Sequence, residues 1–557
     1  MSQKLRIIPV GGLGEIGKNM MYVEYGNNAV IIDAGLMFPE NDMLGIDYII
    51  PDFRALADKK DLVRGIIITH GHEDHTGAIK HLMAEFDAPL YATPLTRGLL
   101  EVKLREAKLY DKVTLNTIHA GDRTNIGPFG IEFFHVCHSI PDGVGLGITT
   151  PAGLIVHSGD FKFDHTPVDG WPTDYAKLAE FAGRGVLALF SDSTNADKAG
   201  WTPSEAVIDP AFDAVFREAP GRIIIATFAS LISRIQQVAN AAFKHGRKMA
   251  LVGTSMVENA RMAQKLGYLE VPDGLIISTD EALRLPAKKV VIMTTGTQGE
   301  PSSILSRLSE GRNRQFDLLP NDTVVLSSHP IPGNEEMVHR TINKLLQRGA
   351  QVIYDPIAAV HVSGHASQEE MKLLLHLVKP KFFVPIHGEL RHLHQHAALA
   401  REVGVAAENV TVVENGTVLE FQNDTLTVGD RIPGGYVFVD GTGVGDIGPS
   451  VMRERESLAE SGLVIVNLRV GAGGQLAGRP EIISRGFVFV KDETELFEAA
   501  QNQIARVAAR LGGGGESDLR HRVESELSDF FYTETKRRPM IFALVNPAAQ
   551  VDEPAAG

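Results

Sequence analysis

Apolar residues occur along this chain in short runs, and several of these runs are followed by a polar residue that can bind a metal. The runs at residues 29–32, 65–69, 131–137, 154–159 and 382–386 have the length and composition of buried strands. A histidine or an aspartate follows each of them directly. Open α/β sheets place their chemistry outside the ends of their strands, so this repeated pattern predicts a site at the rim of a sheet.

The pattern changes between Asp160 and His387. Apolar runs there alternate with segments of helical spacing such as residues 335–346, and the runs lie at residues 222–226, 249–252, 290–293, 323–326 and 351–354. This alternation predicts a parallel sheet with its own core. The stretch holds more than two hundred residues, too many for a loop. We therefore predict a second domain, at residues 205–358, inserted into a first domain at residues 1–204 and 359–430.

The rest of the chain predicts a small α/β domain. The glycine-rich stretch at residues 431–462 has the composition of a linker. Strands are expected at residues 463–466 and 540–544, around helices separated by the glycines at residues 512–515. We place this C-terminal domain at residues 463–557, and we expect disorder from residue 547 onward.

The densest chemistry lies at residues 70–75, where four of six residues are strong metal ligands: His70, His72, Asp74 and His75. In a chain with 20 histidines, such a cluster arises by chance in roughly one chain in a thousand. Strand ends add three more candidates, His138, Asp160 and His387. A lone histidine at a strand end is more often structural than a metal ligand. These three residues therefore become candidate ligands only because the cluster at residues 70–75 is also present. Five imidazoles and two carboxylates suit two ions of Zn²⁺ or Mn²⁺.

Residues 12–17 form a glycine pattern that also occurs in dinucleotide-binding proteins, with Asp33 as the following acid. That interpretation requires a helix after the last glycine. Residues 20–25 have the composition of a strand instead, so we interpret the glycines as a turn between two strands.

The ligand pattern resembles the metallo-β-lactamase superfamily. The resemblance implies an αββα sandwich, with one ion held by His70, His72 and His138. It implies a second ion held by Asp74, His75 and His387, with Asp160 bridging the two ions. Asp33 matches the position of a carboxylate that orients a ligand.

Two polar clusters flank the predicted insertion, at residues 191–194 and 361–366. Alone, the first is more typical of a turn or helix cap. Together with His387, the two clusters resemble the extra motifs of the β-CASP nucleases, and the whole arrangement is similar to the bacterial ribonuclease J family. The resemblance covers nearly the whole chain. It implies RNA as the substrate, 5′-to-3′ exonuclease and endonuclease activities in RNA processing and decay, and a homodimer formed through the C-terminal domain.

The chemistry expected of such a site is attack by a hydroxide on phosphorus, with protonation of the departing 3′ oxygen. His365 is the candidate acid. Asp192 either orients His365 or lies behind a metal ligand, and Asp74 acts at the metals.

An exonuclease must also recognise an end. We expect a 5′-monophosphate to bind the side chains and backbone of Ser230, Ser233, Arg234, His361, Ser363, Gly364 and His365. The alternative for these residues is packing between the two domains.

The net charge of −15 disagrees with broad binding of nucleic acid, which usually needs a basic face. A local channel stays possible, because bound dications reverse the nearby field. No apolar run reaches the length of a membrane span, and the first residues lack the apolar core of a signal peptide, so we expect a cytoplasmic protein. Two rival functions are a two-metal hydrolase of a small ester or lactone, and a silent RNA-binding protein. The inserted domain disfavours the first, and the complete ligand set disfavours the second.

Overall fold

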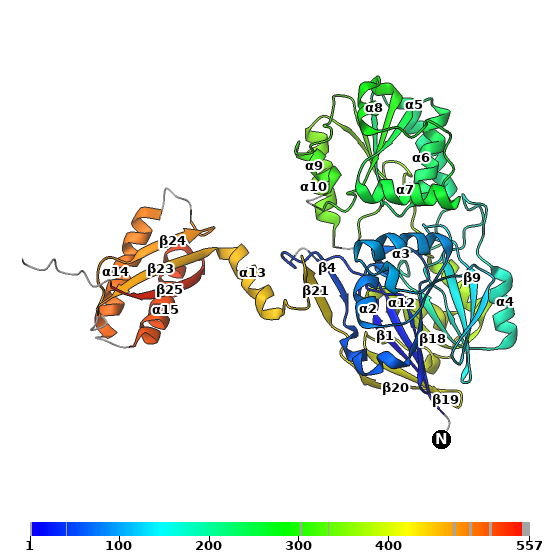
Figure 1. Ribbon diagram of the computed structural model, residues 1–557, viewed down its shortest axis with the longest axis horizontal. Helices are drawn as coiled ribbons and strands as arrows, with labels where there is room; N and C mark the ends of the chain where they lie inside the picture. The colour runs from blue at the N-terminus through cyan, green and yellow to red at the C-terminus, as the bar shows by residue number, and fades with distance from the viewer. Residues whose placement is uncertain are drawn as a thin grey trace, which may run out of the picture. The chain divides into compact units, whose positions relative to one another are not determined.

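The computed structural model describes residues 3–40, 42–300, 303–331, 333–471, 475–488, 493–511 and 515–548. The chain divides into a large unit, Met1–Asn41 with Asp47–Val439, and a small unit, Asp42–Ile46 with Asp440–Gly557. Figure 1 shows the large unit from blue to yellow and the small unit in orange and red. No helix among the described residues is both long and apolar enough to cross a membrane.

Two sheets form the framework of the large unit. The first sheet has the order β20 (Thr425–Arg431), β19 (Thr417–Gln422), β1 (Leu5–Gly11), β2 (Met20–Tyr25), β3 (Asn28–Ile32), β5 (Val63–Ile67), β6 (Leu90–Ala92) and β7 (Leu115–Thr117). The second has the order β18 (Pro380–Ile386), β12 (Val186–Asp192), β11 (Gly153–His157), β10 (Val144–Thr150), β9 (Phe129–His135) and β8 (Arg123–Ile126). A shared core joins the facing surfaces, with Val23 and Ile32 from one sheet and Phe133 and Phe190 from the other.

Helices cover the outer face of each sheet, as their apolar stripes require. The first sheet is covered by η1 (Phe53–Leu62), α2 (Ile79–Glu85) and α3 (Pro94–Glu106). The second is covered by α4 (Tyr175–Arg184), α11 (Gln368–Val378) and α12 (Leu390–Glu402). Short turns complete this domain: α1 (Glu73–Thr76), η2 (Tyr110–Lys112), η3 (Glu205–Val207) and η5 (Ala407–Asn409). The αββα sandwich that the family resemblance implied is confirmed.

The inserted domain contains one five-stranded sheet in which every pairing is parallel. Its order is β14 (Lys248–Leu251), β15 (Val290–Thr294), β13 (Ile223–Ala226), β16 (Thr323–Leu326) and β17 (Gln351–Ile353). One face packs against α5 (Ile208–Glu218), α6 (Ile232–Lys244) and α7 (Thr254–Leu266). The other packs against α8 (Thr279–Arg284), α9 (Ile304–Ser309) and α10 (Glu335–Gln347), with η4 (Ala287–Lys289) preceding β15. All five predicted strands are present, and the boundaries at residues 205 and 358 stay predictions.

The small unit is a three-stranded sheet with helices on one face. The strand order is β24 (Glu481–Arg485), β23 (Leu463–Val470) and β25 (Met540–Pro547). The other elements of this stretch are β22 (Gly443–Val444), α13 (Pro449–Ser461), α14 (Glu493–Leu511) and α15 (Glu516–Thr535). Alternate residues of β23, such as Val464 and Val466, pack against the helices. Residues 512–514 and 549–557, which carry the predicted glycine break and most of the predicted disordered tail, lie outside the described residues.

The predicted linker at residues 431–462 differs from the structure. Residues of β21 (Tyr436–Asp440) pair with β4 (Tyr48–Pro51), and α13 occupies much of the rest. Val437 and Val439 are buried, and the pairing satisfies their backbone groups. The glycines at residues 434 and 435 indicated flexibility, but these buried valines fix the strand.

Candidate metal centre

Strand ends bring all seven predicted ligands to one place. The loop after β5 carries residues 70–75, and its last part forms the short helix α1. His138 follows β9, Asp160 follows β11 and His387 follows β18. Because these strands end at the same rim of the sandwich, residues distant in sequence converge there. The loops after β3 and β5 come from the first sheet, and the loops after β9, β11 and β18 come from the second.

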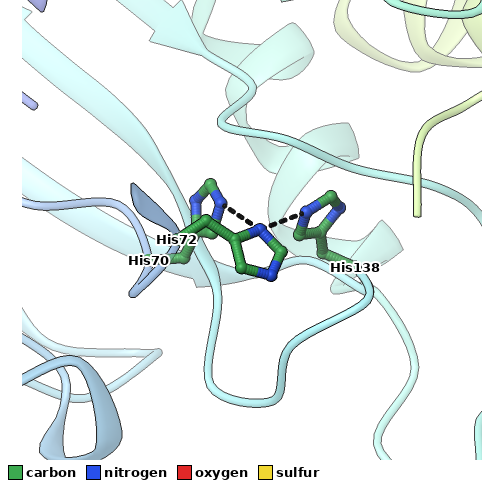
Figure 2. Close-up of side chains that lie close together, drawn as sticks. All are labelled: His70, His72 and His138. Carbon is green, nitrogen blue, oxygen red and sulfur yellow. Dashed lines mark hydrogen bonds between the residues drawn. The ribbon is translucent and has the colours of Figure 1, made fainter. Parts of the chain in front are cut away.

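The first group of ligands contains three imidazoles. Nδ1 of His72 lies 3.1 Å from Nε2 of His70 and 3.1 Å from Nε2 of His138. Figure 2 shows His72 between the other two rings, with these nitrogens directed at one another. One proton can serve only one of two such contacts, whereas a single cation placed among three lone pairs satisfies all of them. This donor set fits a metal ion.

The second group joins two carboxylates to two imidazoles. Nε2 of His75 lies 3.1 Å from Oδ2 of Asp160 and 3.5 Å from Oδ2 of Asp74. Nε2 of His387 lies 3.2 Å from the same oxygen of Asp74 and 3.5 Å from that of Asp160. Oδ2 of Asp160 also approaches Nε2 of His70 and of His138, at 3.6 and 3.8 Å. Asp160 therefore faces both groups.

Burial and charge set the protonation of these ligands. Burial lowers the pKa of His70, His72 and His138, that of His72 to about 4, so all three are neutral and able to bind a metal. Burial also lowers the pKa of His387, but the charges of Asp160 and Asp74 and a hydrogen bond raise it to about 9. The second group thus concentrates negative charge and attracts a cation.

Asp33 supports the second group from behind. Its Oδ2 accepts hydrogen bonds from Nδ1 of His75, at 2.8 Å, and from Oγ1 of Thr69, and its Oδ1 accepts from the backbone N of Thr69. This contact directs Nε2 of His75 toward the other ligands. The position of Asp33 agrees with the role expected for it.

His365 and Asp192 meet beside the ligands. Nδ1 of His365 lies 2.8 Å from Oδ2 of Asp192, and its ring centroid lies 4.9 Å from that of His138. Oδ1 of Asp192 accepts from Thr194 and lies 3.6 Å from Nδ1 of His387. Burial lowers the pKa of His365, but the charge and hydrogen bond of Asp192 raise it above its usual value. The carboxylate of Asp192 therefore favours the protonated form of His365.

Four segments of the chain match known domain families. Residues 13–199 match the metallo-β-lactamase superfamily, and residues 220–345 match the β-CASP domain of ribonuclease J. Residues 349–413 match the RNA specificity domain of Zn-dependent metallo-hydrolases, and residues 450–547 match the C-terminal domain of ribonuclease J.

Whole proteins match over similar lengths. Ribonuclease J2 of Bacillus subtilis is 40% identical over 98% of this chain and 99% of its own length. Ribonuclease J 1 of Streptococcus pyogenes is 42% identical over 97% of both chains, and ribonuclease J of Thermus thermophilus is 42% identical over 97% and 95%. The chain belongs to the ribonuclease J family. The predicted family and enzyme class, a metal-dependent hydrolase, are therefore confirmed.

A solved structure resembles the ribonuclease J fold. It is the crystal structure of a protein of unknown function from Enterococcus faecalis, with a TM-score of 0.53 and 17% identity. The match covers 76% of this chain and 100% of that one. At this identity the likeness concerns the fold alone.

The expected phosphate-binding residues of this ribonuclease J lie in different surroundings. Ser233 and His138 line one small cavity of about 20 Å³. Ser230 and His361 are partly exposed, and the buried Nδ1 of His361 has no hydrogen-bond partner among the described residues. Ser363 accepts a hydrogen bond from Asn195 at 2.8 Å, and Asn195 also donates to the carbonyl of His365.

Arg234 differs from the expectation that it binds substrate. Only 1% of it is exposed, and it pairs with Glu205 at 2.7 Å. Its other donors bond to Gln237, Ser327 and the carbonyl of Val360. These contacts support the alternative that Arg234 packs the inserted domain against its flanking segments.

Gly364 supports a ligand, a role that the sequence did not indicate. Its carbonyl accepts a hydrogen bond from Nδ1 of His138 at 2.7 Å. A Cβ at this position would lie 2.7 Å from the His138 ring, so only glycine allows the approach. Ser191 and Ser193 are fully buried, and Oγ of Ser193 lies 2.9 Å from Nδ1 of His396.

Two supporting residues of the ribonuclease J site were missed in the sequence. Nδ2 of Asn19 lies 3.1 Å from Nε2 of His75 and donates to the carbonyl of Asp74. Oγ1 of Thr194 lies 2.6 Å from Nδ1 of His387. Neither belongs to a ligand pattern. For Thr194, its neighbour Asp192 was the available indication.

Proposed function

We propose that this chain is a two-metal ribonuclease that hydrolyses RNA phosphodiesters, from the 5′ end toward the 3′ end and also within a strand. Membership of the ribonuclease J family carries the proposal, and the convergence of seven ligands supports it. The matched RNA specificity domain supports RNA as the substrate class.

In this proposal His70, His72 and His138 hold one divalent ion, Zn²⁺ or Mn²⁺. Asp74, His75 and His387 hold the other, and Asp160 bridges them. The approach of Oδ2 of Asp160 to both groups, within 3.8 Å, supports this assignment. When bound, such ions supply a nucleophilic hydroxide at neutral pH and positive charge beside the phosphate oxygens.

His365 is the proton donor to the departing 3′ oxygen. Its Nδ1 is occupied by Asp192, which leaves Nε2 to carry the proton to the substrate. Asp192 is a positioning residue, since it holds the imidazole and keeps it protonated. The carbonyl of His365 accepts hydrogen bonds from Asn195 and Thr202, which fix the loop that presents the ring.

A 5′-monophosphate binds near Ser230, Ser233, His361 and the backbone of residues 363–365. Nδ1 of His361, which has no hydrogen-bond partner within the described part of the chain, and the shared cavity of Ser233 and His138 support this location. Arg234 positions these segments through Val360 and Glu205 and does not contact the phosphate.

The protein forms a homodimer through its C-terminal domain. One face of the β24–β23–β25 sheet packs on helices, and the other carries exposed apolar side chains, namely Ile483, Phe542 and Leu544. These residues are 47, 48 and 50% exposed. A second copy covering this face would remove apolar area from water.

Digestion of end-labelled RNA by the purified protein tests the proposal. With Mn²⁺, Zn²⁺ or Mg²⁺ supplied in turn, we expect mononucleotides from 5′-phosphorylated RNA, together with internal cuts, and weaker exonuclease activity on 5′-hydroxyl RNA. Asp74→Asn should abolish both reactions, whereas Asp111→Asn, in an exposed turn, should not. Hydrolysis of a lactone without cleavage of RNA would instead identify a small-molecule hydrolase.

A further inference from the structure

A large cavity lies in the inserted domain, away from the metal ligands. Its volume is about 950 Å³, within the range of sites that hold a nucleotide-sized molecule. It is lined by residues that follow the carboxyl end of β14 and by residues of α7, on one face of the sheet, and of α8 and α9, on the other. Crevices at this end of a parallel sheet are where α/β domains bind ligands.

Four arginines line the cavity. Arg261 lies on α7, Arg307 on α9, and Arg312 and Arg314 on the following loop. Glu258 is the single acidic residue among the lining side chains of this cavity. In a chain with a net charge of −15, this local excess of positive charge marks a site for an anion.

Two of these arginines are available to a ligand. Arg261 and Arg314 are exposed, and neither forms an ion pair within the part of the chain that the structure describes. Arg312 pairs with Glu310. Guanidinium groups bind phosphates in a planar, two-pronged geometry, so these two arginines, which form no ion pair with the described residues, can bind two phosphate groups of one polyanion.

The walls also offer apolar contacts. Val257, Ile304 and Leu251 line the cavity beside the arginines. Gly253 lines it with a φ of 110°, and a Cβ there would lie 3.3 Å from Ile304. Bases bind against apolar surface while their phosphates bind arginine, so the lining matches a nucleotide better than a free phosphate.

The cavity lies at the same end of the parallel sheet as the expected phosphate-binding residues Ser230 and Ser233. Ser230 and Ser233 follow the carboxyl end of β13, and one strand, β15, separates β13 from β14. Neighbouring strands lie about 4.8 Å apart, so the two strand ends are about 10 Å apart. Asn259 of α7 also donates to the carbonyl of Ala229 in the loop before Ser230. One RNA strand can therefore reach both places.

We propose that this arginine cavity, lined by residues 251–254, 257, 258, 261, 279, 304, 307 and 312–315, binds a segment of substrate RNA outside the cleaved linkage. The inference rests on the proposed function. Such a site would make long RNA a better substrate than short RNA, and it would explain how an acidic protein holds a polyanion without a broad basic surface.

The test replaces both available arginines in the full-length enzyme, as Arg261→Gln with Arg314→Gln. We compare kcat/KM on 5′-phosphorylated RNA of about twenty and about four nucleotides, lengths above and near the smallest single-strand sites. The ratio of the two values should fall about tenfold, as expected for losing two phosphate contacts. The slope of log kcat/KM for long RNA against log salt should decrease by about 1.4, at about 0.7 per contact.

Controls separate charge from folding. Arg340→Gln removes an exposed arginine of α10 that pairs with Glu336, and it should leave the ratio unchanged. Arg261→Lys with Arg314→Lys keeps the charge and should restore most of the ratio. An unchanged ratio in the folded double glutamine variant would overturn the inference. Inhibition by free mononucleotides that bind the cavity, with kcat/KM independent of RNA length, would also overturn it. Failure to cleave either RNA would instead refute the proposed function.

Discussion

At the scale of single residues, ligands were predictable from the sequence where several fall in one short segment. Residues 70–75 could be recognised as metal ligands because four of the six positions carry metal-binding side chains. Asn19 and Thr194 carry no such pattern, because an amide or hydroxyl that supports a ligand through space can lie anywhere in the chain. For Arg234 the sequence left two interpretations open, substrate binding and domain packing, and its contacts with Glu205 and Val360 favour packing.

Replacing Asp192 tests its positioning role. With Asp192→Asn the charge that raises the pKa of His365 is lost, so that pKa should fall. The acid form of His365 is required, and activity declines as pH rises through its pKa. The alkaline limb of the kcat profile on RNA should therefore shift to lower pH, and kcat at pH 8 should fall about tenfold or more.

The same variant separates the two roles considered for Asp192. Metal content should stay at the wild-type level if Asp192 acts through His365. Loss of metal with an unshifted pH profile would show that its contact with His387 matters instead. Asp197→Asn, in the same loop but paired with Arg391, is the matched control.

At the scale of elements, apolar runs predicted the strands of both domains, because burial on both faces imposes a continuous apolar sequence. The five parallel strands of the insertion are examples. β24 and β21 were not predicted, since β24 is a half-exposed edge strand and β21 follows two glycines. Strand order was also beyond the sequence, as pairing depends on contacts across hundreds of residues, such as β1 with β19.

One buried carboxylate joins three elements near the site. Glu370 of α11 is fully buried and accepts hydrogen bonds from the backbone N of Phe163, Thr202 and Ser367. Glu370→Ala should leave three buried donors unsatisfied and destabilise the large unit by about 3 kcal/mol or more. Thermal unfolding should show a midpoint lower by several degrees.

The neighbouring residue provides the comparison for this variant. Glu369 is exposed and pairs with Lys372, so Glu369→Ala should change the midpoint very little. Equal midpoints for the two variants would contradict the role assigned to Glu370.

At the scale of the whole molecule, the sequence predicted an inserted domain and a C-terminal domain, and both are present.

The exposed apolar face of the sheet in the small unit tests the proposed homodimer. Phe542→Asp places a charge on this face, on the edge strand β25, so the proposed dimer should dissociate to monomers at micromolar concentration, because burying an unpaired charge is costly. Light scattering after size-exclusion chromatography measures this. Tyr532→Asp, on the helical side and 42% exposed, should leave the mass unchanged.

The path of the chain around the inserted domain concerns its ancestry. β12, where the chain departs, and β18, where it returns through α11, are adjacent parallel strands. A recombination event could graft or delete the entire lobe at this junction without disturbing a single ladder of the sandwich. The scaffold is therefore modular. A sandwich that keeps its metal ligands can gain the inserted domain, and with it a polymeric substrate, in one genetic step.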